Sequence, residues 1–277
     1  MVHTVFSDQN IQVTYDPFGL IPNNDLQLLG QRYPTDKMGH GYLKIYQDFL
    51  EPRRTERLNF VELGVYWGAS MMMWRDFFSH AMLVGVDIQF SNEMVAFFNN
   101  TRTNVDFFSA DSADPHLSKS LENFFTANGR DGFDVVIDDA SHLQYDMMKS
   151  LGNIYPSMNS GGIYIIEDMC TAEALNQGAK WWGSPDESVS ADFLSLPGME
   201  RTSEFKKDWL PNGKKDTYYC AETTTQRFKE TGVFDSAFLT KEENKYISEN
   251  TDAIHFYKSG TGHLQDCGSS VAILIKK

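Results

Sequence analysis

Two stretches of the chain place carboxylates directly after runs of apolar residues. The first stretch ends in Asp139 and His142, and the second ends in Glu167 and Asp168. Buried parallel strands have this pattern, so we expect both groups at the carboxyl edge of one sheet. If the two strands are neighbours, their axes lie about 4.8 Å apart. The three carboxylates could then converge on one cation, with His142 beside them.

These residue types favour a metal site with a base beside it. Three carboxylates without a thiolate make an oxygen-rich ligand set, which suits Mg²⁺ or a similar hard divalent ion. A hydroxyl near such an ion loses its proton more readily, and a histidine accepts protons near neutral pH. The structural alternative is that the acids are solvated strand ends and His142 is a helix cap. That alternative loses weight because four such residues follow two neighbouring strands.

Strands alternate with helices along most of the chain. We expect strands at residues 59–64, 83–88, 105–111, 133–138 and 163–166, and two more at 253–258 and 271–275. Helical patterns cover residues 25–29, 35–49, 71–78, 117–128, 145–154, 224–230 and 241–250. The last two strands are joined by a short connection and should pair as an antiparallel hairpin. The order predicts an α/β fold: a doubly wound, mostly parallel seven-stranded sheet with an antiparallel last strand.

A glycine-containing turn follows the first expected strand. Gly64 and Gly68 separate this strand from the helix at 71–78, an arrangement that places a ligand at a helix N-terminus. Asp87 ends the second strand about 20 residues later, the spacing at which an acid holds ribose hydroxyls. This part of the chain is therefore a candidate site for a ribose-bearing cofactor.

The composition of the chain disfavours some classes of binding partner. The 277 residues have a formal net charge of −14, which disfavours binding to nucleic acid or to anionic membranes. Three cysteines without C-x-x-C spacing predict a reducing compartment. No apolar run is long enough to span a membrane, and no signal peptide is recognisable. We expect a soluble, cytoplasmic protein that acts on a small molecule; a homo-oligomer is an open alternative.

We divide the chain into four parts. Residues 1–57 form an N-terminal arm, with a short strand at 11–15 as one option, and helices that cover the cofactor site. Residues 58–169 form a cofactor-binding α/β core, 170–250 a substrate lid or insertion, and 251–277 a hairpin that completes the sheet. Long connections are more often lids or binding loops than filler. Four aromatic residues there suit either an apolar or sugar-stacking pocket or plain packing: Trp181, Trp182, Tyr218 and Tyr219.

The strand count and the first turn together resemble the class I S-adenosylmethionine-dependent methyltransferases, which have a Rossmann-like fold. Their first motif is written acid-x-G-x-G-x-G. In this sequence it runs from Glu62 through Gly64 to Gly68, with Tyr66 in place of the middle glycine. The turn also departs from G-x-G-x-x-G, the pattern of dinucleotide-binding folds, which weakens a nicotinamide interpretation.

A more specific resemblance covers roughly residues 34–169. Four signatures in order are similar to the macrolide-sugar O-methyltransferases of the mycinamicin and macrocin type: Thr35-Asp36-Lys37 with His40, Tyr42 and Tyr46; Glu62-Leu63-Gly64-Val65; Asp138-Asp139-Ala140-Ser141-His142; and Ile166-Glu167-Asp168. The resemblance implies that Asp139, Glu167 and Asp168 hold a divalent ion such as Mg²⁺. It also implies His142 as the base, so that the catalytic residues are His142 and Asp139. Ala140 stands where the family usually has glycine.

The resemblance also implies a site for S-adenosylmethionine. Gly64 and Gly68 would let the backbone approach the methionine portion, Asp87 would accept the ribose hydroxyls, and Asp111 would reach the adenine amino group. Lys37 and His40 would close over the cofactor from the N-terminal helix. Three further candidates come from the same strand ends and turn: Glu62, Ser70 and Asp138, the last of which serves either the cofactor or simply the fold.

The interpretation that results is a metal-dependent O-methyltransferase for a glycoside or another small secondary metabolite. Two other classes stay open. One is a hydroxylase-type oxidoreductase that uses the carboxylates and the histidine with iron, although the ligand set is poor in histidine. The other is a cofactor-binding scaffold without turnover, with residues 170–250 as its partner surface.

Overall fold

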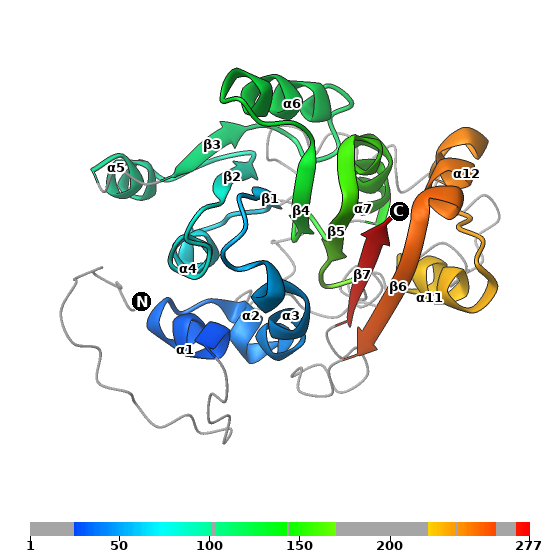
Figure 1. Ribbon diagram of the computed structural model, residues 1–277, viewed down its shortest axis with the longest axis horizontal. Coiled ribbons are helices and arrows are strands. Elements are labelled where there is room, and N and C mark those ends of the chain that lie inside the picture. The colour runs from blue at the N-terminus through cyan, green and yellow to red at the C-terminus, as the bar shows by residue number, and fades with distance from the viewer. Residues whose placement is uncertain (1–24, 101–103, 143, 170–220, 237, 259–269) are drawn as a thin grey trace, which may run out of the picture.

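The centre of the fold is a seven-stranded sheet. The computed structural model describes residues 25–100, 104–142, 144–169, 221–236, 238–258 and 270–277. The strand order is β3-β2-β1-β4-β5-β7-β6 (Figure 1). The strands are β1 (Asn59–Leu63), β2 (Met82–Asp87), β3 (Val105–Ser109), β4 (Phe133–Asp138), β5 (Met158–Ile166), β6 (Thr251–Lys258) and β7 (Ser270–Lys276). The pairs among β1 to β5 are parallel, and β7 is antiparallel to both β5 and β6. The predicted fold class is confirmed.

Helices cover both faces of the sheet. One apolar layer packs α1 (Asp25–Arg32), α3 (Tyr42–Leu50), α4 (Ala69–Phe77) and α5 (Asn92–Asn100) on one face. The other layer holds α6 (Leu117–Ala127), α7 (Gln144–Ile154), α11 (Ala221–Thr231) and α12 (Lys241–Asn250). Shorter pieces are α2 (Asp36–Gly39) and the 3₁₀ turns η1 (Glu51–Arg53) and η2 (Tyr155–Ser157). Among the described residues, no helix has the length and apolar character needed to cross a bilayer.

The apolar composition of the central strands follows from this layering. Side chains alternate between the faces of a strand, so Val61 and Leu63 of β1 join one apolar layer while Phe60 joins the other. All residues of β1 are buried. Because β1, β4 and β5 are neighbours in parallel register, their carboxyl ends meet at one edge. The residues that follow them are therefore brought together.

The predicted helix over residues 35–49 is wrong as a single element. The structure divides it into α2 and α3 at His40 and Gly41. Gly41 has a φ of 76°, in the left-handed region that glycine enters without steric cost. Apolar spacing alone continues across this break, so the pattern did not reveal it. The helix α5 was also not predicted.

Part of the segment predicted as a lid belongs to the packed domain. Helix α11 contacts β6, β7 and α7, and α12 contacts α7 and η2. Phe228 of α11 and Ile247 of α12 are buried in the same apolar layer as α6 and α7. The aromatic residues at 181, 182, 218 and 219, and the strand predicted at 11–15, lie outside the described residues. The two helical patterns in this region are confirmed.

Candidate active site

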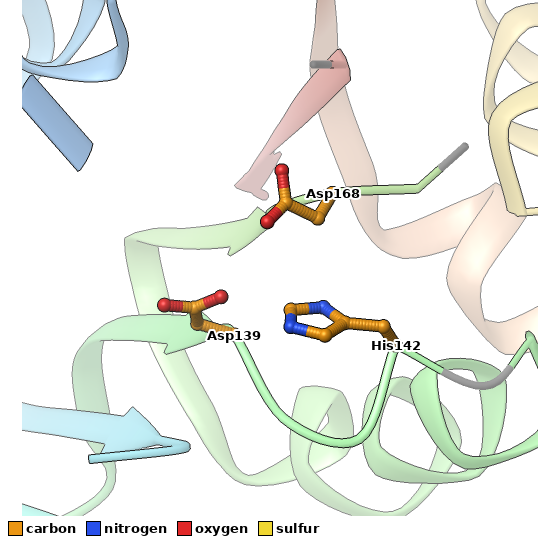
Figure 2. Close-up of side chains that lie close together, drawn as sticks. All are labelled: Asp139, His142 and Asp168. Carbon is orange, nitrogen blue, oxygen red and sulfur yellow. The ribbon is translucent and has the colours of Figure 1, made fainter. Parts of the chain in front are cut away.

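Three potential metal-ligating side chains meet at the carboxyl edge of the sheet. Ligand atoms of Asp139, His142 and Asp168 all lie within 4.8 Å of one another. Figure 2 shows the imidazole ring of His142 pointing toward the two carboxylates. Asp139 directly follows β4 and donates its backbone N–H to Leu63 O at 2.9 Å. Two carboxylates and one imidazole form a donor set that can hold a divalent cation.

The backbone at this edge is unusual. Ser141, His142 and Asp168 have φ values of 49°, 53° and 49°, and Tyr66 in the nearby turn has 52°. Non-glycine residues seldom adopt such angles, and when they do they cluster at functional sites. One further backbone hydrogen bond links the ends of β4 and β5, because Glu167 N donates to Asp138 O at 2.9 Å. The two strand ends are thus held together immediately before they diverge.

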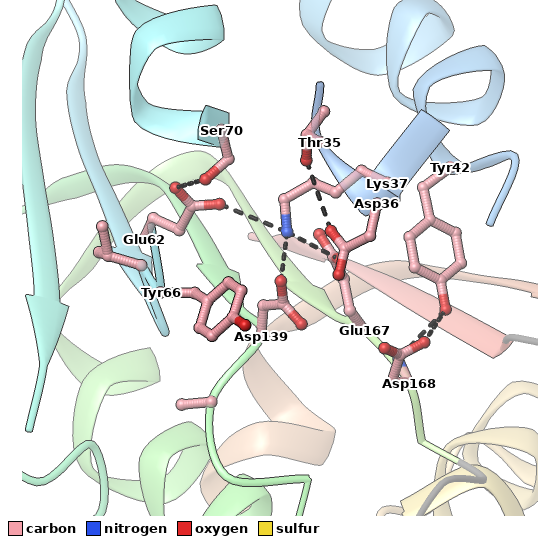
Figure 3. A network of polar contacts seen from close by, with 12 residues as sticks. Thr35, Asp36, Lys37, Tyr42, Glu62, Tyr66, Ser70, Asp139, Glu167 and Asp168 are labelled. Atoms are coloured by element: carbon pink, nitrogen blue, oxygen red, sulfur yellow. Dashed lines mark hydrogen bonds and ion pairs between the residues drawn. The ribbon is translucent and has the colours of Figure 1, made fainter. Parts of the chain in front are cut away.

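Lys37 of α2 lies among three carboxylates from three different strand ends (Figure 3). Its Nζ donates to Asp139 Oδ2 at 2.5 Å and to Glu167 Oε2 at 2.9 Å, and lies 3.4 Å from Glu62 Oε1. The side chain is 1% exposed. Burial lowers the pKa of this ammonium group, but the three carboxylates outweigh it and raise the pKa well above its usual value. The three carboxylates therefore favour the charged form of Lys37.

Glu62 and Ser70 form the outer part of this network. Ser70 Oγ donates to Glu62 Oε2 at 2.8 Å, and burial raises the pKa of the Glu62 carboxyl, opposed by Lys37. Glu62 is completely buried at the end of β1. Its contacts tie the turn that follows β1 to the carboxylates that follow β4 and β5.

Glu167 is buried against the N-terminal helices. Burial, together with the neighbouring Asp139, raises its pKa well above the ordinary value. Burial and the carboxylate of Glu167 also raise the pKa of the Tyr46 hydroxyl. Within the described part of the chain, Glu167 Oε1 has no hydrogen-bond partner, an unusual situation for a buried carboxylate oxygen. The ligand cluster and this oxygen fit a cation bound at the strand ends.

The turn after β1 is shaped by glycine and by Asp87. Gly64 has a φ of 84°, and Gly68 has 78°. Asp87 Oδ2 accepts the backbone N–H groups of Val65 and Tyr66, each at 2.9 Å. The carboxylate at the end of β2 therefore fixes the turn, and Tyr66 projects into solvent with 77% of its surface exposed.

Replacing Gly64 by alanine should lower the free energy of unfolding by about 3 kcal/mol or more. A Cβ at this position would lie 2.2 Å from the backbone oxygen of Asp139, so overpacking adds to the strain of the left-handed backbone. The matched control is Gly129→Ala, at a φ of 68° with nothing within 4 Å, which should cost about 1 kcal/mol. Urea unfolding measures both; equal losses would contradict the close approach.

The remaining predicted cofactor residues are not members of the ligand cluster, and each has contacts with other parts of the protein. Asp111 Oδ1 accepts the N–H of Ala113 at 2.9 Å, within the turn after β3. Asp138 is fully buried and accepts the Tyr164 hydroxyl at 3.0 Å; burial raises its pKa to about 8. His40 stacks on Tyr42, with ring centroids 5.4 Å apart. Lys37, predicted to close over the cofactor, has the carboxylates described above as its neighbours.

Sequence reasoning missed the roles of Tyr42 and Tyr46. Their spacing of four residues was interpreted as one apolar helix face, and both rings are indeed buried. The hydroxyl of Tyr42, however, donates to Asp168 Oδ1. Tyr42 and Tyr46 follow Lys37 by five and nine residues. This closeness in sequence could have indicated their role, because side chains of α2 and α3 can then reach the same group of acids.

Comparison with known proteins shows which proteins this chain resembles. No protein-family model matches the chain. It is 31% identical over 152 residues to 8-demethyl-8-alpha-L-rhamnosyl tetracenomycin-C 2'-O-methyltransferase of Streptomyces olivaceus, covering 52% of this chain and 37% of that one. It is 29% identical over 157 residues to mycinamicin VI 2''-O-methyltransferase of Micromonospora griseorubida, covering 53% and 37%. Demethylmacrocin O-methyltransferase of Streptomyces fradiae is 29% identical over 184 residues, covering 62% and 42%.

The chain therefore spans less than half the length of the curated relatives it matches. Among solved structures, the mycinamycin-pathway methyltransferase MycE, in complex with Mg and S-adenosylhomocysteine, superposes with a TM-score of 0.54. The match has 22% identity and covers 92% of this chain and 55% of that one. At this identity the likeness shows the fold, which is that of the class I S-adenosylmethionine-dependent methyltransferases.

Proposed function

We propose that this chain, which has the class I methyltransferase fold, is a divalent-metal-dependent, S-adenosylmethionine-dependent O-methyltransferase. The observation that supports this best is the cluster of Asp139, His142 and Asp168 at the carboxyl edge of the sheet. Ligands of open α/β sheets bind at that edge. The curated relatives, which are named as O-methyltransferases of glycosylated compounds, support the same reaction.

The turn after β1 and the acid after β2 would hold the cofactor. Gly64 and Gly68 keep side chains away from the turn, and Asp87 Oδ2 is already engaged by two backbone N–H groups. Its second oxygen, Oδ1, accepts a longer contact of 3.4 Å from Gln89 N and no other hydrogen bond from the described residues, so Oδ1 is the oxygen we assign to the ribose hydroxyls. When bound, S-adenosylmethionine supplies an electrophilic methyl group on its sulfonium.

Asp139 and Asp168, with Glu167 behind them, would hold the metal ion. Oxygen ligands of this kind suit Mg²⁺ or Mn²⁺. When bound, the ion supplies positive charge that favours the deprotonated form of an acceptor hydroxyl. Lys37 offsets part of the negative charge of these acids, and so allows several carboxylates to be ionised side by side.

His142 would take the proton from the acceptor hydroxyl. Its ring lies in the cluster with both aspartates, and this position supports its role as a general base for an acceptor hydroxyl bound there. With the proton on His142, the acceptor oxygen would be able to receive the methyl group that the bound cofactor supplies. The chain's remaining contribution is to align the two reactants.

The acceptor we propose is a hydroxyl of a glycoside or a comparable small metabolite. The named substrates of the relatives, a rhamnosyl tetracenomycin and mycinamicin VI, support a sugar hydroxyl. The net charge of −14 argues for a neutral or cationic acceptor over a phosphorylated one. We propose no nucleic-acid or membrane partner.

Metal removal tests this function directly. Purified protein is incubated with labelled S-adenosylmethionine and a panel of glycosides, with EDTA or with excess Mg²⁺. We expect EDTA to lower methyl transfer by about 100-fold or more, the range of a few kcal/mol of charge stabilisation, and Mg²⁺ to restore it. Undiminished turnover in EDTA would remove the metal from the proposal.

The hydroxylase alternative is less well supported by the donor set. Iron oxygenases of the facial-triad type use two histidines and one carboxylate, whereas this cluster has one histidine and two carboxylates. Product formation with iron, oxygen and a reductant, but not with S-adenosylmethionine, would reverse this preference.

A further inference from the structure

The hydroxyl of Tyr42 contacts both the side chain and the backbone of Asp168. It donates to the carboxylate oxygen Oδ1 and accepts the backbone N–H of the same residue at 3.3 Å. These two residues are 126 positions apart in the chain. Figure 3 shows Tyr42 reaching from the N-terminal helices down to the end of β5. One hydroxyl therefore connects α3 to the last acid of the cluster.

The backbone conformation of Asp168 explains why both contacts matter. Its φ of 49° is a left-handed angle that a non-glycine residue adopts only at a cost. The pairing of β5 with β4 and β7 ends at Ile166, so the Asp168 amide lies outside the hydrogen bonds of the sheet. The Tyr42 oxygen accepts this N–H and so stabilises the turn that aims the carboxylate.

The ring of Tyr42 is buried and packs against two other aromatic rings. It is fully buried and stacks between His40, at 5.4 Å, and Tyr46, at 6.0 Å. Its hydroxyl also lies 3.5 Å from Ser270 O, at the start of β7. The position of the hydroxyl therefore follows from the packing of α3 on the sheet and of the ring against its neighbours.

We propose that Tyr42 is a positioning residue for the metal ion, acting through its ligand Asp168. The hydroxyl orients the carboxylate through Oδ1, and the other oxygen, Oδ2, would be available as a ligand of the ion. This inference rests on the proposed function, because it assigns Asp168 to the metal. Partners that orient ligating carboxylates typically change metal affinity by about 10- to 100-fold when they are removed.

The test is a calorimetric titration of Mn²⁺ into the Tyr42→Phe variant and into the wild-type protein. Phenylalanine keeps the stacked ring and removes only the hydroxyl. We expect the Mn²⁺ affinity to fall by about 10-fold or more, with S-adenosylhomocysteine affinity within about two-fold of wild type. A merely structural role would lower the two affinities together or neither.

Tyr33→Phe is the matched control. The Tyr33 hydroxyl also donates to an aspartate, Asp76, which is not in the metal cluster. We expect both variants to lose similar stability in thermal unfolding, and only Tyr42→Phe to lose Mn²⁺ affinity. Equal Mn²⁺ affinities of Tyr42→Phe and wild type would overturn the inference, as would a Tyr42→Phe chain that does not fold. Wild-type protein that binds no Mn²⁺ would instead contradict the proposed function.

Discussion

Lys37→Met is expected to lower the free energy of unfolding by about 3–5 kcal/mol, the cost of removing one partner from a buried ion pair. The ammonium group lies within hydrogen-bond distance of Asp139 and Glu167, and all but 1% of its side-chain surface is buried. Methionine has a similar length and shape, so the variant loses the charge while the space stays filled. Asp139, Glu167 and Glu62 would then face one another without a cation, and their mutual repulsion adds to the loss.

The control for this prediction is Lys119→Met. Lys119 pairs with Glu122 at 3.1 Å, but its side chain is 73% exposed, and surface pairs contribute about 0–1 kcal/mol. Urea unfolding of both variants, each with and without Mg²⁺, measures the difference. A Lys37→Met variant as stable as Lys119→Met would show that the three acids are not ionised together around this lysine.

His142→Gln is expected to reduce methyl transfer by about 10²- to 10⁴-fold, the usual contribution of a general base. Glutamine keeps a polar side chain in the left-handed turn at residue 142 but cannot take up the proton. Because the imidazole lies within the cluster of Asp139 and Asp168, the structure also permits it to be a ligand. The two roles differ in what they do to metal affinity.

If His142 is a base and not a metal ligand, its replacement should leave metal and cofactor binding unchanged. We expect His142→Gln to bind Mn²⁺ and S-adenosylhomocysteine within about three-fold of wild type, since only the chemical step loses stabilisation. His116→Gln, an exposed histidine at the start of α6, should leave both turnover and binding unchanged. A loss of Mn²⁺ affinity that parallels the loss of turnover would make His142 a ligand instead.

The order of strands and helices follows from local pattern. The apolar runs of β1, β2, β4 and β5 are buried on both faces, and such strands are nearly continuous in apolar residues. The neighbours β4 and β5 then bring Asp139 and Asp168 to one edge, so the meeting of these two acids could be predicted. The third member of the cluster is His142, where Glu167 was the predicted ligand. The break at Gly41 could not, because apolar periodicity does not record the φ angle that ends α2.

Long-range polar contacts could not be predicted from local sequence patterns. Lys37 is polar and lies on a short helix, and nothing in its local sequence predicts that three strand ends surround it. Tyr42 has the spacing of a core residue and is one, yet its hydroxyl reaches Asp168. Such contacts depend on how α2 and α3 dock on the sheet, which is a property of tertiary packing and not of the residues beside them.

The most direct test of the central claim is a titration of Mn²⁺ into protein saturated with S-adenosylhomocysteine, comparing wild type with Asp139→Asn. The claim is that the acids after β4 and β5 form a metal site next to the cofactor site. It predicts one Mn²⁺ bound per chain in the wild type, and a loss of affinity of 100-fold or more, about 2.7 kcal/mol, in Asp139→Asn. Asp252→Asn, at an exposed position of β6, should bind as the wild type does. Equal affinity in all three proteins would contradict the claim.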